Sequence, residues 1–179
     1  MHLTETTLSS ETILEGLIFR VERQDVRLSD GSESKRDIVR HRGGVGVLGR
    51  KPCGTWLLVR QYRKAVACLV TEIVAGMRDA GEDAETAARR ELEEETGHTA
   101  TRMVYLGRSF ASPGYTDEVV ELFYADLSEV AGANRLDTDE RVEVVPFTDD
   151  ELHRALAANE LPDSKTMVAW MLAGEKGYR

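Results

Sequence analysis

Residues 76–97 read GMRDAGEDAETAARRELEEETG, and this stretch decides the fold of the chain. Its second half predicts a helix over residues 83–96, because Asp83 is a favourable N-cap and Gly97 suits the left-handed position that follows a helix. A glycine-bounded loop leads into this helix. The stretch therefore predicts a loop, a helix and a turn in close succession.

The predicted helix carries carboxylates on the side that should face the protein. At about 100° per residue, Glu91 and Glu95 fall on one stripe of the helix. Ala84 and Ala88 share that stripe, and Glu94 lies beside it. Like charges at this spacing destabilise a helix by roughly 0.2–0.5 kcal/mol per pair, and partial burial raises the cost. A bound divalent cation would remove the conflict, and hard oxygen ligands suit magnesium. From the residues alone, a metal site and a solvated helix face both stay open.

The whole stretch resembles the signature of Nudix hydrolases. Gly76, Glu82 and the run of residues 90–97 match that signature at its spacing. The one departure is His98, where an aliphatic residue is usual, and it bears on local packing rather than on metal binding. The resemblance covers roughly residues 14 to 172. It implies an α/β (α+β) fold, in which a mixed β-sheet is sandwiched between helices and accompanied by a small N-terminal antiparallel sheet.

The same resemblance implies a set of metal ligands. Glu91 and Glu95 are the main ligands that it implies. Glu94 shares the site and its catalytic work, and the backbone carbonyl of Ala75 is a further ligand. The implied cofactor is Mg²⁺, with Mn²⁺ as the alternative.

Further patterns resemble the ADP-ribose pyrophosphatase branch of the family. Pro113 stands where the branch carries a proline, so Pro113 and Gly114 are expected near the substrate, although an ordinary turn proline is the plainer interpretation. Arg63 resembles a substrate-binding arginine, whose guanidinium can hold a diphosphate through two hydrogen bonds. The alternative is a surface arginine. Residues 72–76 resemble the lead-in to the signature, with Val74 where proline is common.

Three downstream or neighbouring glutamates complete the implied site. Glu118 is expected near the substrate. Glu140 lies in a loop just before a strand, where the branch carries a catalytic glutamate that activates water or completes the metal shell. A solvated acidic loop is the alternative for Glu140, and Glu82 is the second candidate for the general base. Arg90 is implied to be structural, pairing with Glu82 or a neighbour to hold the loop.

The first forty residues resemble a small sheet that members of the branch exchange between two subunits. Arg36 and Asp37 would then contact substrate from the partner chain, so we expect a homodimer. Neither position carries an aromatic ring to stack on a base. Tyr115, Phe110 or Phe19 are substitutes for that role, although most such residues would be core.

Elsewhere the chain predicts strands first, with helices between or after them, which suits a mixed sheet covered by helices. We expect residues 1–42 to form the N-terminal antiparallel sheet and residues 43–179 the catalytic domain. The expected strands are residues 16–28, 34–41, 45–48, 55–61, 69–74, 102–110, 119–125 and 142–145. A capping box at Thr148 and Glu151 starts a helix that ends near residue 159, and a last helix covers residues 164–172.

Composition limits the partners. The 179 residues include 23 basic and 32 acidic ones, for a formal net charge of −9. This charge argues against nucleic-acid binding, which needs a basic surface, but a metal ion can still recruit a phosphorylated small molecule. No apolar run is long enough to span a membrane, and the N-terminus lacks a signal pattern, so we expect a cytoplasmic protein. Cys53 and Cys68 have no metal or redox spacing, and we expect small buried side chains.

The expected reaction is the hydrolysis of a diphosphate bond in a nucleoside diphosphate-linked small molecule. ADP-ribose, giving AMP and ribose 5-phosphate, is the first candidate substrate. Another sugar-nucleotide or dinucleotide, of the GDP-mannose, FAD or NADH type, is the second. A non-catalytic module that senses a nucleotide is the remote alternative, because such modules usually lose the signature carboxylates that this chain keeps.

Overall fold

The computed structural model of the chain describes residues 3–133, 136 and 141–179, and it divides into two compact units. Unit 1 comprises Met1–Gly43 with Phe110–Val119, and unit 2 comprises Gly44–Ser109 with Val120–Arg179. The segment Phe110–Val119, which connects two strands of unit 2, therefore belongs with the N-terminal strands.

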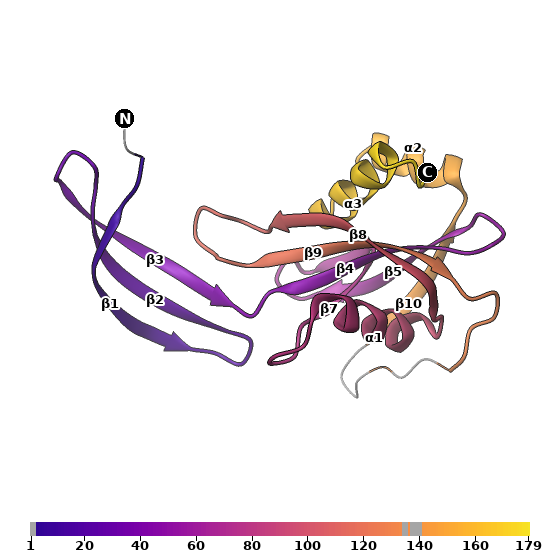
Figure 1. Cartoon of the computed structure of the whole chain (residues 1–179), viewed down its shortest axis with the longest axis horizontal. Coiled ribbons are helices and arrows are strands. Elements are labelled where there is room, and N and C mark those ends of the chain that lie inside the picture. The colour runs from indigo at the N-terminus through magenta and orange to yellow at the C-terminus, as the bar shows by residue number, and fades with distance from the viewer. Residues whose placement is uncertain (1–2, 134–135, 137–140) are drawn as a thin grey trace. The chain divides into compact units, whose positions relative to one another are not determined.

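Unit 1 is built on a three-stranded antiparallel sheet in the order β1-β2-β3 (Figure 1). Its strands are β1 (Thr6–Glu15), β2 (Phe19–Arg27) and β3 (Glu33–His41). The predicted β2–β3 hairpin is confirmed, and its turn uses Gly31 at a φ of 89°. Sequence analysis missed β1 because all ten of its residues are exposed, so it lacks the alternation of apolar and polar residues that marks a half-buried strand.

Unit 2 contains a seven-stranded mixed sheet. The order β10-β5-β4-β9-β8 forms its path, with β6 paired to β5 and β7 paired to β4. Only the β4–β9 register is parallel among those recorded for the described strands. The strands are β4 (Gly44–Arg50), β5 (Trp56–Arg63), β6 (Cys68–Glu72), β7 (Val74–Met77), β8 (Ala100–Phe110), β9 (Val119–Leu127) and β10 (Val142–Phe147).

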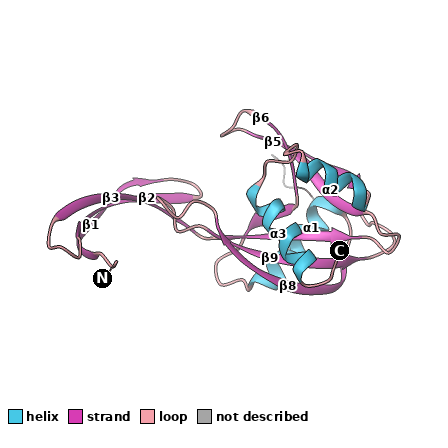
Figure 2. Ribbon diagram, turned by 90° about the horizontal axis from the view of Figure 1, so that it is seen from above, coloured by secondary structure: helices cyan, strands magenta, loops and turns pink. Residues whose placement is uncertain are grey.

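Helices cover both faces of this sheet. Helix α1 (Ala84–Thr96) lies on one face, and α2 (Asp149–Ala157) and α3 (Ser164–Glu175) lie on the other (Figures 1 and 2). The side chains of β4 and β5 alternate between two apolar clusters: Val45, Val47, Leu57 and Val59 pack with α1, whereas Leu48, Trp56 and Leu58 pack with α2 and α3. The predicted mixed sheet between helices is confirmed.

The helix ends follow the predicted chemistry. Asp83 accepts hydrogen bonds from the backbone N–H groups of Glu85 and Thr86, and Gly97 closes α1 at a φ of 71°. Thr148 and Glu151 form the expected capping box at α2. Helix α3 runs a few residues beyond its predicted end, because its side chains pack into the core as far as Ala173.

One predicted strand, residues 69–74, is interrupted in the structure. The chain leaves β5 and joins β4 at this point, so β6 ends at Glu72 and β7 begins at Val74. Ile73 lies between them, and its backbone N–H donates to the Thr166 hydroxyl at 2.9 Å. The hydroxyl of α3 thus satisfies a buried backbone donor that the change of partner strand leaves outside the sheet.

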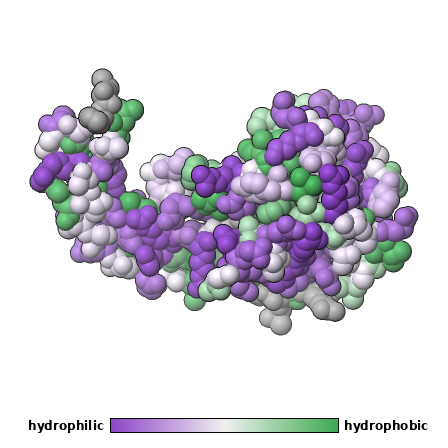
Figure 3. Space-filling model, in the orientation of Figure 1, coloured by the Kyte–Doolittle hydropathy of each residue, from purple (hydrophilic) through white to green (hydrophobic). Residues whose placement is uncertain are grey.

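Two expectations about side-chain burial are wrong. Cys53 and Cys68 are free and exposed, since Cys53 lies in a turn and Cys68 begins the β5–β6 return. Phe19, Phe110 and Tyr115 are also exposed rather than core residues, because they belong to the thin N-terminal unit. On the face drawn in Figure 3, hydrophilic residues predominate and apolar ones form small groups. Within the described residues, no helix is long and apolar enough to cross a membrane.

Candidate active site

Helix α1 presents two carboxylates to the interior of unit 2. Glu91 is 9% exposed and Glu95 is 2% exposed, and both lie on the buried face with Ala88 and Leu92. Glu94 is more open, with 36% of its side chain exposed. The predicted inward stripe of carboxylates is confirmed, and it stands against the sheet rather than in bulk solvent.

Gly76 of β7 makes room for the first of these carboxylates. A Cβ atom added at Gly76 would lie 2.0 Å from the carboxyl carbon of Glu91, closer than any real contact. The Glu91 carboxylate therefore rests directly on the backbone next to Ala75. This contact brings Glu91 together with the stretch of main chain that sequence analysis assigned to metal binding.

Arg90 links the carboxylates to the preceding loop. Its Nη1 atom donates to Glu91 at 2.7 Å and to Glu94 at 3.0 Å. Its Nε and Nη2 atoms donate to both oxygens of Glu82 at 3.1 and 3.0 Å, so the expected pairing with Glu82 is present. The hydrogen bonds from Arg90, and then the one from the backbone N–H of Asp79, hold the pKa of Glu82 below its usual value.

The donor set suits a hard divalent cation by its chemistry. Carboxylate oxygens and a backbone carbonyl are the ligands that magnesium and manganese take in proteins. The missing side chain of Gly76 leaves space for the Glu91 carboxylate. Among the described residues, no three acidic, histidine or cysteine side chains converge on one point in this geometry. Arg90 donates to Glu91 and Glu94, so a metal ion held by those carboxylates would compete with Arg90 for them.

Arg63 stands at the end of β5, near Glu95 of α1. Its Nε atom donates to Glu72 at 2.7 Å, and Glu72 is buried at the end of β6. Burial lowers the pKa of Arg63, but its hydrogen bond to Glu72 and the nearby charges of Glu72 and Glu95 outweigh that effect and raise it. The guanidinium therefore stays charged beside the carboxylate face of α1.

The remaining substrate residues that sequence analysis proposed all lie in unit 1. Arg36 donates two hydrogen bonds to Glu5, and Asp37 accepts two from Arg23. Pro113 and Gly114 form an exposed turn in which the carbonyl of Ser112 accepts from Tyr115 and Thr116. Glu118 has a carboxylate oxygen 3.8 Å from Nδ1 of His41. The structure thus divides the proposed substrate residues between the two units.

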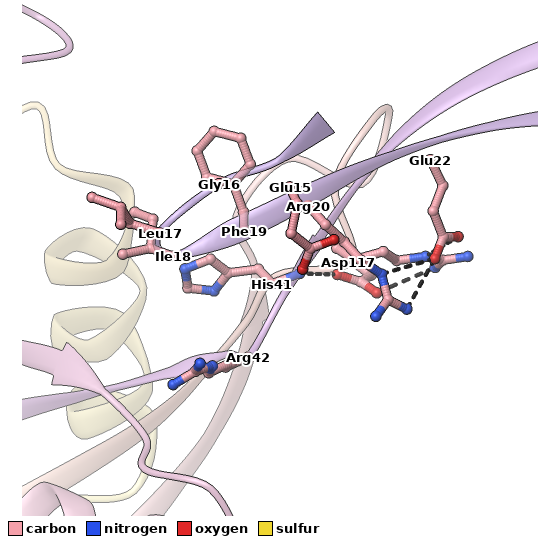
Figure 4. A pocket seen from close by; sticks show the side chains of 11 residues that line it. Glu15, Gly16, Leu17, Ile18, Phe19, Arg20, Glu22, His41, Arg42 and Asp117 are labelled. Atoms are coloured by element: carbon pink, nitrogen blue, oxygen red, sulfur yellow. Dashed lines mark hydrogen bonds and ion pairs between the residues drawn. The ribbon is translucent and has the colours of Figure 1, made fainter. Parts of the chain in front are cut away.

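Unit 1 also holds a hollow of about 570 Å³ that sequence analysis did not foresee (Figure 4). Its charged wall is a network in which Arg40 donates to Glu22 at 2.9 Å and to Asp117 at 3.2 Å. The hydrogen bond from Arg40, and then the one from Arg20, lower the pKa of Glu22. The hollow is lined by residues 15–20, Glu22, Arg40, His41, Arg42 and Asp117. Of the residues singled out from the sequence, Phe19 lines it.

His98, the departure from the signature, is accommodated. It is 6% exposed, and its Nδ1 atom lies 2.9 Å from the backbone oxygen of Ser128. The backbone N–H of Ser128 in turn donates to Thr99. A polar ring thus fits this buried position because the chain after β9 supplies a hydrogen-bond partner.

Two residues mark the limits of sequence analysis here. Glu140, the proposed general base, lies outside the described residues. Lys165 of α3 gave no signal in the sequence, yet its Nζ atom contacts the buried Glu72. The two residues are 93 positions apart, so no local pattern could have paired them.

Comparison with known proteins extends over both units. A family described as the NUDIX domain matches residues 40–171, and one described as the nucleoside diphosphate sugar hydrolase N-terminal domain matches residues 5–39. The chain is 39% identical over 168 residues to an ADP-ribose pyrophosphatase of Bacillus subtilis (strain 168), which covers 93% of this chain and 91% of that protein. It is also 39% identical over 166 residues to a methanol dehydrogenase activator of Bacillus methanolicus, covering 92% of this chain and 90% of that protein.

A solved structure shares the fold. The crystal structure of an ADP compounds hydrolase superposes with a TM-score of 0.85 and 24% sequence identity, over 99% of this chain and 98% of that one. The expected fold class is therefore confirmed.

Proposed function

The chain belongs to the Nudix family, and we propose that it hydrolyses the diphosphate bond of ADP-ribose to give AMP and ribose 5-phosphate. The family assignment rests on a domain match over residues 40–171. The choice of ADP-ribose is supported by the similarity to the Bacillus subtilis enzyme, which extends over nearly the whole of both chains.

The observation that carries this proposal is the position of Arg63 beside the carboxylates of α1. Glu95 is close enough to Arg63 to affect its pKa, and Arg63 is itself anchored on the buried Glu72. A diphosphate needs cationic groups for its oxygens and a site for a metal ion within reach of the same phosphates. Arg63 supplies such a cationic group, and the buried carboxylates of α1 support the proposal of a metal site in unit 2.

Hydrolases of this family generally need divalent metal ions, and we propose Mg²⁺ for this chain, with Mn²⁺ as a substitute. Glu91, Glu95, Glu94 and the carbonyl of Ala75 would hold the metal. When bound, it would neutralise charge on the phosphate oxygens and lower the pKa of the attacking water.

The protein's own groups would then have distinct tasks. The guanidinium of Arg63 holds non-bridging phosphate oxygens and orients the diphosphate. Glu140 accepts a proton from water as the water oxygen bonds to one phosphorus and the bond from that phosphorus to the bridging oxygen breaks. One water is consumed and two phosphate monoesters leave. Glu82 is the weaker candidate for this base, because the hydrogen bonds that lower its pKa also lower its basicity.

We also propose that two copies of the chain build each complete site. In a dimer, Arg36, Asp37, Glu118, Pro113 and Gly114 of unit 1 would face the substrate of the partner copy. Exposed apolar side chains support this proposal, since the N-terminal strands leave large ones uncovered: Leu8, Ile13, Leu14, Leu17 and Ile18. Light scattering that gave the mass of one chain would reject the dimer.

The deciding experiment is incubation of the purified protein with ADP-ribose and Mg²⁺, followed by chromatography of the products. We expect AMP and ribose 5-phosphate with metal and none after chelation. GDP-mannose, FAD and NADH, run beside ADP-ribose, test the second class of substrates. Faster turnover of one of these would replace ADP-ribose, and no metal-dependent turnover of any would favour the non-catalytic alternative.

A further inference from the structure

A buried carboxylate joins Arg63 to a lysine from a distant helix. Glu72 has only 2% of its side chain exposed and is contacted on both oxygens. Its Oε1 atom accepts from Nε of Arg63 at 2.7 Å, and its Oε2 atom accepts from Nζ of Lys165. Burial of a carboxylate costs free energy unless charged partners contact it, and Glu72 has two such partners.

Lys165 is itself held from the other side. Its Nζ atom donates to Asp163 at 2.8 Å, and Asp163 is the N-cap of α3. Asp163 also accepts from the backbone N–H and the hydroxyl of Thr166 at 2.9 and 2.6 Å. The Thr166 hydroxyl then accepts from Ile73, the residue after Glu72. The lysine is thus fixed between the end of α3 and the strand break.

This arrangement determines how Arg63 can meet Glu72. Within the described part of the chain, neither terminal amino group of Arg63 donates a side-chain hydrogen bond, and its Nε atom is the donor to the carboxylate. An arginine usually binds a free carboxylate through two parallel hydrogen bonds. Lys165 donates to Oε2 of Glu72 and so competes with the second of those bonds, which leaves both amino groups of Arg63 available.

The charges around Arg63 also bear on its hydrogen bond to Glu72. Arg63 lies close to Glu95, one of the proposed metal ligands, so a divalent cation bound there would repel the guanidinium. The hydrogen bond to buried Glu72 retains Arg63 against that repulsion. Two cations, Arg63 and Lys165, face two anions, Glu72 and Asp163, so the group carries no net charge of its own.

We propose that Lys165 is a positioning residue for the diphosphate of the substrate. Acting through Glu72, it keeps the two amino groups of Arg63 out of a second bond to that carboxylate and available to the phosphate oxygens. This role rests on the proposed function, in which Arg63 binds the diphosphate. The competing explanation is that Lys165 only fastens α3 to the break between β6 and β7.

The test compares Lys165→Met with the conservative Lys165→Arg, and Lys176→Met serves as the matched control. Lys176 lies at the other end of α3 and is exposed, and among the described residues its Nζ atom donates only to the backbone carbonyl of Tyr105. With ADP-ribose and Mg²⁺ we expect Lys165→Met to raise KM roughly tenfold and to change kcat by less than about threefold. Lys165→Arg should restore most of the loss, and the control should match the parent protein.

A double-substitution cycle separates positioning from direct contact with the phosphate. If Lys165 acts only through Arg63, then Lys165→Met should add nothing to the KM of Arg63→Ala. Independent, multiplying losses would overturn the proposal, because Lys165 would then bind substrate itself. A lower melting temperature with unchanged KM would overturn it too and leave only a fastening role.

A measurement that needs no turnover keeps the proposal separate from the proposed function. In protein labelled with ¹⁵N at arginine, the Nε–H signal of Arg63, assigned by its loss in Arg63→Ala, reports the bond to Glu72. We expect Lys165→Met to shift this signal and Lys176→Met to leave it in place. An unmoved signal in Lys165→Met would overturn the positioning role. Failure of the parent protein to hydrolyse ADP-ribose would instead reject the proposed function, while the signal would still decide whether Lys165 orients Arg63.

Discussion

Two pairs of an arginine with a carboxylate show how differently the two units use charge. In unit 1, Arg23 and Asp37 form a bidentate pair whose side chains are 43% and 54% exposed. In unit 2, Arg63 meets Glu72, whose side chain is 2% exposed. Exposed pairs contribute little because water and salt screen them. Arg63 is itself 41% exposed, but loss of this pair would take a charged partner from a buried carboxylate, which costs more than loss of an exposed pair.

The comparison extends to the surroundings of each pair. Unit 1 carries exposed cross-strand charge pairs along an open sheet, whereas the buried Glu72 of unit 2 joins Arg63 of β5 to Lys165 of α3. Perturbed and buried charges mark functional sites more often than exposed ones do. We therefore expect substitutions in unit 2 to have the larger effects on turnover.

The largest effect is expected from Glu95→Gln, which removes one charge from the buried face of α1. Turnover should fall by at least about a hundredfold with the fold intact, because a proposed metal ligand is lost. Steady-state assays and circular dichroism measure the two properties. The control is Glu85→Gln, the same change at an exposed position of α1. Near-normal turnover in Glu95→Gln would remove the proposed metal role.

Glu140→Gln should have the second-largest effect on turnover. The loss of a general base slows a reaction by about 10²-fold or more, so kcat should drop while substrate affinity changes much less. Rapid-quench or steady-state kinetics with ADP-ribose gives both values. If kcat is unchanged, the base role passes to another residue.

Gly76→Ala tests whether the Glu91 carboxylate must rest on β7. The new Cβ would lie 2.0 Å from the carboxyl carbon, so the flexible side chain has to move. We expect the Mg²⁺ concentration for half-maximal activity to rise roughly tenfold, with little loss of stability. Gly132→Ala is the control, since its nearest atom beyond the chain neighbours would be 3.5 Å away. The same metal requirement in both variants would contradict this role.

A smaller effect is expected from the pair of Arg90 and Glu82. Because the folded protein lowers the pKa of Glu82 below its ordinary 4.5, this carboxylate stabilises the fold above that pH. The contribution is lost as the pH falls through the lowered pKa. Melting temperatures measured from pH 7 down to pH 3 should therefore decline less steeply in Glu82→Gln than in the parent protein. Equal slopes would show that the loop does not depend on this ion pair.

The smallest effect should follow from Arg23→Ala in unit 1. We expect the melting temperature to change by less than about 2 °C at moderate salt, because the pair with Asp37 is open to water. Differential scanning calorimetry measures the change. A drop as large as that of Glu72→Ala would mean that unit 1 is covered in solution, as the proposed dimer would require.

Much of the fold could be predicted because it depends on local patterns. Residue type predicts the caps of α1 at Asp83 and Gly97. Helical periodicity predicts the inward stripe of Glu91 and Glu95. The structure confirms both. Strand β1 was missed because a fully exposed strand carries no apolar alternation. The break at Ile73 was missed because an apolar run does not reveal a change of partner strand.

The sequence by itself determined the helix α1, its carboxylates and the family to which the chain belongs, since spacing along one element is enough to define them. Only the tertiary structure decided that Gly76 supports Glu91 and that Lys165 shares Glu72 with Arg63. Those contacts join residues from separate elements, and a buried charge selects its partner by position in space. The packing of α3 against the strand break brings Lys165 and Glu72 together from 93 residues apart.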